Sequence, residues 1–231
     1  MRTRLSATLV LVGLAIPVVD CVSLKRTPDA RLFVLESLVE PRPVPPGEAP
    51  TAVIGVEAAR LPGHLQRPQI VTWTARNELA IDEFVRWGEP LRDGLTRTLQ
   101  EDLAGLLPEY RIIRRPWSGD TTTRCRVRVS LRVFGLQRDG MVRLDGRWAL
   151  LPDRGGLALA QQPVSLQRGP VSSVGGAPPA TGVDLMSELV ADLSRQIAGA
   201  IRALPPEQKP VEIEEERVTS EEIEDRSDRE P

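Results

Sequence analysis

Two features of this sequence carry side chains that could do chemistry: a cysteine near the amino terminus and a row of arginines in the middle of the chain. Cys21 follows a basic start, Arg2 and Arg4, and an apolar run, Leu9 to Ile16, that is too short to span a membrane. The cysteine directly after such a secretory signal is the one that bacterial lipoproteins acylate. We therefore predict a signal peptide over residues 1–21 with a lipobox-like end, and lipidation at Cys21.

The residues just before this cysteine agree with the prediction only in part. Val18 and Val19 suit a lipobox, but Asp20 stands where glycine, alanine or serine normally precedes the cysteine. A carboxylate beside the cleaved bond is expected to slow processing. An ordinary signal with an incidental cysteine, or an uncleaved anchor, therefore stays open.

The arginine row lies in a segment, Arg124 to Val133, whose side chains alternate with a period of two. This period predicts a strand with one buried face. The residues expected to face the core are Cys125, Val127, Val129, Leu131 and Val133, and those on the other side are Arg124, Arg126, Arg128, Ser130 and Arg132. The arginines could bind phosphate or an acidic partner, or they could keep a solvated sheet face soluble. The candidate partner-binding residues are Arg124, Arg126, Arg128 and Arg132.

The remaining residues argue against catalysis, metal binding and nucleic-acid binding. The single histidine, His64, lies in a turn-like sequence, and there is no nucleophile motif, phosphate loop or cysteine-histidine cluster. Consecutive carboxylates such as Glu101-Asp102 diverge, so we expect them to be surface charges. Basic runs with interleaved aromatic residues are also absent. We therefore expect no catalytic residue, no metal site, no cofactor and no nucleic-acid partner.

Charge divides the chain into a body and a tail. Residues 207–231 hold 11 acidic and 4 basic residues, a net charge of −7, which leaves +5 for the rest of a 231-residue chain whose total is −2. The acidic segment has no aromatic residue, so we expect a disordered tail. Residues 22–30 are expected to be a linker, and residues 31–206 a single domain.

The stretch from Leu61 to Leu107 predicts a hairpin followed by a helix. Strands are expected over Gln69–Ala75 and Glu78–Asp82, joined by a tight turn. Leucines at positions 91, 95, 99 and 103 form one face of a helix that starts near Pro90 and ends before Pro108.

Further strands and a second helix complete the expected fold. The strands are expected over Arg31–Leu38, Ala52–Val56, Glu109–Arg114, Arg124–Val133, Met141–Leu150 and Leu157–Leu166, and the helix over Asp184–Leu204. Together these elements predict an α/β (α+β) single domain, in which two long amphipathic helices pack on one mixed, mainly antiparallel sheet.

Several pieces of the central stretch resemble a known family in their order and spacing. They are Leu61-Pro62, Leu65-Gln66-Arg67-Pro68-Gln69-Ile70, Trp87-Gly88-Glu89-Pro90-Leu91 and the leucine helix. The run is similar to the PqiC (YmbA) family, the auxiliary lipoproteins of MCE-type ABC transport systems, from about Leu32 to Leu204.

This resemblance implies a lipoprotein at the periplasmic face of the bacterial outer membrane, held there through Cys21. Val22, in place of an aspartate after the cysteine, agrees with sorting to that membrane. The implied partner is a periplasmic MCE-domain protein of a system that moves lipids or other hydrophobic molecules between the two membranes. Copies of such proteins can also self-associate. One rival is a carrier domain that holds an acyl chain itself, and another, which the residue inventory disfavours, is an enzyme.

Overall fold

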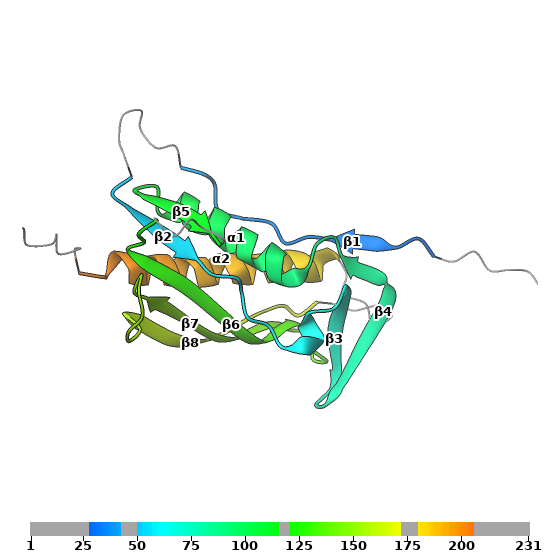
Figure 1. Cartoon of the computed structure of the whole chain (residues 1–231). Coiled ribbons are helices and arrows are strands. Elements are labelled where there is room, and N and C mark those ends of the chain that lie inside the picture. The colour runs from blue at the N-terminus through cyan, green and yellow to red at the C-terminus, as the bar shows by residue number, and fades with distance from the viewer. Residues whose placement is uncertain (1–27, 43–49, 116–120, 172–179, 206–231) are drawn as a thin grey trace, which may run out of the picture.

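The described strands form two mixed sheets rather than the single sheet expected from the sequence (Figure 1). The computed structural model describes residues 28–42, 50–115, 121–171 and 180–205. The strands are β1 (Arg31–Phe33), β2 (Ala52–Val56), β3 (Gln69–Ala75), β4 (Glu78–Trp87), β5 (Tyr110–Arg114), β6 (Cys125–Leu136), β7 (Val142–Leu151) and β8 (Ala160–Arg168). The helices are α1 (Leu91–Leu106) and α2 (Ala180–Arg202), with a short 3-10 helix at Gly63–Leu65. These elements make a mixed α+β single domain.

The larger sheet has the strand order β5-β2-β6-β7-β8. Strand β2 pairs in parallel with β5 and with β6, whereas β6, β7 and β8 form an antiparallel meander. The β6–β7 turn contains the Asp139-Gly140 pair that predicts a hairpin, and Gly140 has the positive φ of 77° that such a turn needs. Helix α2 packs against β6, β7 and β8 and covers one face of this sheet.

The smaller sheet has the order β1-β4-β3 and lies at one end of the molecule (Figure 1). Strands β3 and β4 form the hairpin expected from the sequence, but β4 continues to Trp87, five residues beyond the predicted end. The hairpin contacts the larger sheet where Trp73 lies against Gly135, since a Cβ at Gly135 would be 3.2 Å from the indole ring. Strand β3 therefore joins the smaller sheet to β6 of the larger one.

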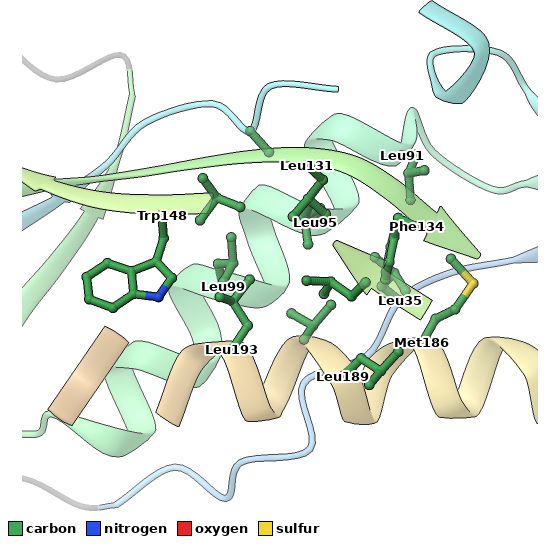
Figure 2. Close-up of a cluster of buried hydrophobic side chains, with 14 of the residues drawn as sticks. Leu35, Leu91, Leu95, Leu99, Leu131, Phe134, Trp148, Met186, Leu189 and Leu193 are labelled. Carbon is green, nitrogen blue, oxygen red and sulfur yellow. The ribbon is translucent and has the colours of Figure 1, made fainter. Parts of the chain in front are cut away.

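The two helices lie side by side and run in the same direction, because Asp102 contacts Ser194, and Leu106, further along α1, contacts Arg202, further along α2. The core fills the space between the helices and the strands. Figure 2 shows Leu95 and Leu99 of α1, Leu189 and Leu193 of α2, and Trp148 and Phe134 of the sheet converging there. These six side chains are at most 1% exposed.

Helix α1 is buried on a second side, which the sequence did not predict. Strand β1 ends at Phe33 rather than Leu38, and the chain after it runs along α1, where Leu35 contacts Arg97 and Ser37 contacts Asp102. The approach is close: a Cβ at Gly105 would lie 2.7 Å from a methyl carbon of Val39. Asp102, predicted to face water, is fully buried as a result.

A β-bulge changes the alternation of β6. Leu131 pairs with Gly146 and Val133 with Asp145, so Arg132 is left without a partner on β7. Beyond the bulge, Phe134 takes the buried position and Val133 is only half-buried. The prediction that Val133 faces the core is therefore wrong, since one extra residue shifts a period-two pattern to the other face.

Candidate functional site

Two of the four candidate arginines form a cluster with a glutamate that the sequence analysis missed. Glu57 follows β2, and its carboxylate accepts hydrogen bonds from Arg126 (2.9 Å) and from Arg128 (2.6 and 3.2 Å). Arg126 also donates to the Pro152 carbonyl at 3.0 Å. The side chains of Glu57, Arg126 and Arg128 are 10%, 16% and 30% exposed. The two arginines are therefore largely buried and paired with Glu57, so they connect β2 to β6 and present only part of their charge to solvent.

Parallel pairing of β2 with β6 brings Glu57 to the arginines. The Glu57 amide donates to the Val127 carbonyl at 2.9 Å, so the glutamate continues the ladder between its two partners. In the sequence, Glu57 is separated from Arg126 by 69 positions and from Arg128 by 71. The one local feature of the sequence that could have indicated this cluster is a lone acidic residue, Glu57, directly after a buried apolar strand.

The charges of the cluster set the protonation state of Glu57. Burial alone would raise its pKa, but the hydrogen bond from Arg128 and the positive charges of Arg128, Arg126 and Arg115 outweigh burial. The pKa of Glu57 is therefore lowered, and the glutamate is ionised at neutral pH.

The other two candidate arginines have different surroundings. Arg124 donates to the carbonyls of Leu204 (3.2 Å) and Pro205 (2.9 Å), and its guanidinium lies 5.6 Å from the centre of the Tyr110 ring. It thus binds carbonyls at the end of α2, where a cation is favoured. Arg132, at the bulge, is exposed and has no hydrogen bond or ion pair with the described residues. Among the four, Arg132 is the residue best placed to meet an acidic partner.

A second polar cluster ties the amino-terminal segment to both helices. Asp102 of α1 accepts hydrogen bonds from Ser37 at 2.6 Å and from Ser194 of α2 at 2.9 Å. Burial raises the pKa of Asp102 more than these bonds and the charge of Arg195 lower it. A protonated carboxyl also fits the geometry, because Ser194 lies 2.9 Å from the Val190 carbonyl and can donate there while accepting from Asp102.

Of the two cysteines, only Cys125 lies among the described residues. Cys125 is a fully buried free thiol on β6, and burial raises its pKa to about 11, so it is a packing residue as expected. The predicted lipidation site, Cys21, lies outside the described residues, as do the signal peptide and the acidic tail. Its lipidation stays a prediction.

The described residues offer no metal-binding cluster. They contain no group of three or more histidine, cysteine, aspartate or glutamate side chains that could hold a metal ion. A polar hollow of about 360 Å³ lies beside the start of α1, and it is lined by Ala58, Glu89, Asp93, Thr96, Arg114 and Arg115. No helix in the described part is both long and apolar enough to cross a membrane.

Comparison with solved structures supports the fold. Protein XCC0632 from Xanthomonas campestris, of the DUF330 family, has a TM-score of 0.59 and 15% identity, covering 76% of this chain and 100% of its own. A crystal structure of an uncharacterized protein has a TM-score of 0.56 and 23% identity, covering 65% and 92%. No curated protein matches the chain.

The solved structures support only the fold, whereas a family model identifies the family. The model of the ABC-type transport auxiliary lipoprotein component matches residues 33–198, from the last residue of β1 almost to the end of α2. The match includes the hairpin and leucine helix on which the resemblance rested, and it spans well over half of the chain. The protein therefore belongs to the family of ABC-type transport auxiliary lipoprotein components.

Proposed function

We propose that this protein is a lipid-anchored, non-enzymatic adaptor of an MCE-type ABC system, which moves lipids or other hydrophobic molecules between the inner and outer membranes. The family match over residues 33–198 is the observation that carries this proposal. Cys21 is the proposed anchor and the periplasmic face of the outer membrane the proposed location. The partner is a periplasmic MCE-domain protein, and copies of the chain can associate with each other.

The packing of the domain favours an adaptor over a carrier. An acyl chain needs an apolar cavity, but the space between the helices and the sheet is filled by side chains such as Leu95, Leu99 and Leu193, none of them exposed. The described hollows lie at the surface and are lined by charged residues as well as apolar ones.

Affinity capture from cells that express the whole transport system tests the proposal. The tagged full chain, extracted in a mild detergent, is expected to retain the MCE-domain protein, and its Cys21→Ser variant to lose membrane attachment. Recovery of the chain with bound phospholipid and without an MCE-domain protein would favour the carrier instead. Genes for a permease, an ATPase and an MCE protein beside this one would add independent support.

A further inference from the structure

A groove with an apolar floor lies between the amino-terminal segment and the start of α2. In the segment from Leu32 to Leu38, alternate side chains point inward, and those that point outward are mostly apolar. Leu32, Val34 and Leu38 are 65%, 44% and 48% exposed. Three large apolar side chains on one outward face are unusual for a short segment beside water.

The rim of this groove is acidic. The hollow, about 400 Å³ in volume, is lined by Leu32, Phe33, Val34, Glu36, Leu38, Ala180, Val183, Asp184, Ser187 and Glu188, a set with three carboxylates and no basic side chain. Arg168 partly offsets Glu188 at 3.5 Å. The positive end of the α2 dipole counts for about half a charge, which the three carboxylates outweigh. The groove therefore favours a cationic ligand.

An unpaired strand edge runs beside the groove. Strand β1 is the terminal strand of the order β1-β4-β3, so one edge of its backbone has no strand neighbour in the described part of the chain. The amide of Glu36 donates to Ser187 of α2 at 3.2 Å, which holds the segment in an extended form just after β1. An open edge next to apolar side chains is the geometry in which proteins accept an added strand.

We propose that this groove binds an extended segment of a protein partner, in which apolar residues alternate with lysine or arginine. The apolar side chains would cover Leu32, Val34 and Leu38, and the basic ones would meet Glu36 and Asp184. The proposal rests on the proposed function, because it takes the partner to be the periplasmic subunit of the transport system.

Charge disfavours the other occupants of the groove. A second copy related by two-fold symmetry would bring the same carboxylates face to face. The segment 207–231 of this chain carries a net charge of −7 and would be repelled. Insertion into a bilayer would take the carboxylates of Glu36 and Asp184 out of water with no basic side chain among the residues that line the groove.

The test compares charge reversal in the groove with charge reversal elsewhere, in the full chain co-expressed with the transport system. The groove variant is Glu36→Lys with Asp184→Lys, and the matched control is Glu78→Lys with Glu83→Lys on the exposed hairpin. The groove variant is expected to capture the periplasmic subunit about tenfold less at low salt, and the difference to shrink at about 0.5 M salt. A milder pair, Glu36→Gln with Asp184→Asn, keeps the test valid if the reversed variant melts early.

Two further measurements identify the occupant. A photo-cross-linking residue in place of Leu32 is expected to label the periplasmic subunit, whereas the same residue at Leu157, which is 91% exposed, is not. The purified full chain is also expected to bind a synthetic decapeptide of alternating valine and lysine at least tenfold tighter than one of valine and glutamate.

The outcomes distinguish a failure of the groove proposal from a failure of the proposed function. If the chain captures the subunit and the groove variant captures it equally well, the groove proposal is wrong and the function stands. Labelling of a second copy or of phospholipid from Leu32 also overturns the proposal. If no subunit of an ABC system is captured by any form of the chain, the proposed function itself fails, while the peptide measurement still decides the chemistry of the groove.

Discussion

Replacement of Glu57 by glutamine tests whether the arginine cluster stabilises the fold. The substitution keeps the shape of the side chain, removes its charge and places an amide donor against guanidinium donors. Breaking a fully buried ion pair typically costs about 3–5 kcal/mol. Because the Arg128 side chain is 30% exposed and can turn toward water, we expect about 2 kcal/mol for Glu57→Gln. In a domain of this size that loss lowers the Tm by roughly 4–8 °C.

The pH dependence of this loss has a defined sign. The pKa of Glu57 is lowered in the folded protein, so its contribution is fully present above the ordinary glutamate range, near pH 4.3, and is lost as the pH falls through the folded pKa. The difference between wild type and Glu57→Gln is therefore expected to be constant from about pH 8 to 5 and to shrink in more acid solution.

Urea unfolding followed by circular dichroism at several pH values measures both effects. The control is Glu101→Gln, which removes a surface ion pair with Arg97 in which Glu101 is 43% exposed, and is expected to cost less than about 0.5 kcal/mol. Equal losses for the two variants, or a Glu57→Gln loss that does not change in acid, would refute the reasoning.

Four more outcomes are expected. Asp102→Asn leaves the free energy of unfolding at pH 7 unchanged or raises it by about 1 kcal/mol, because burial raises the pKa of Asp102 and penalises its ionised form. The stabilisation by this carboxyl is lost as the pH rises through its folded pKa, so urea unfolding from pH 4 to 8 is expected to show a flatter profile for the asparagine variant. Gly146→Ala costs about 3 kcal/mol or more in a thermal melt, since the new Cβ would lie 2.3 Å from the Ser130 carbonyl oxygen; a loss below about 1 kcal/mol would mean that the bulge moves to accommodate it. Cys21→Ser moves the protein out of the membrane fraction, and mass spectrometry of the native chain that found an unmodified Cys21 would rule out the lipid anchor. Truncation after Pro206 shifts the Tm by about 1 °C or less, because the acidic segment has too little apolar surface to offset its ordering entropy, whereas a loss of several degrees would show that it packs on the domain.

Local patterns predicted the elements that depend on near neighbours in the sequence. The tight turn at Arg76-Asn77 and the Asp139-Gly140 hairpin both form where they were expected. The leucines at positions 91, 95, 99 and 103 are all buried. Turn chemistry and side-chain period act over a few residues, so the sequence displays them directly.

The features that were missed depend on long-range packing. Nothing near Asp102 in the sequence indicates that the chain around Ser37 runs along α1 and covers this carboxylate, because 65 residues separate the two side chains. The division into two sheets likewise depends on β1 pairing with β4 and not with the strands of the larger sheet. The ion pairs of Glu57 with Arg126 and Arg128 arise only after parallel pairing of β2 with β6.

The path of the amino-terminal segment also determines how the domain would carry mechanical load. Strand β1 runs parallel to β4, and just beyond it the Leu35 carbonyl accepts a hydrogen bond from Arg97 of α1 at 2.7 Å. A pull directed along β1 would load its bonds to β4 together in shear instead of opening them one at a time. If the bonds of β1 broke, the hydrogen bonds of Leu35 and Ser37 to α1 would carry the load next. A tether at the amino-terminal side can therefore hold the domain under tension without peeling open the larger sheet.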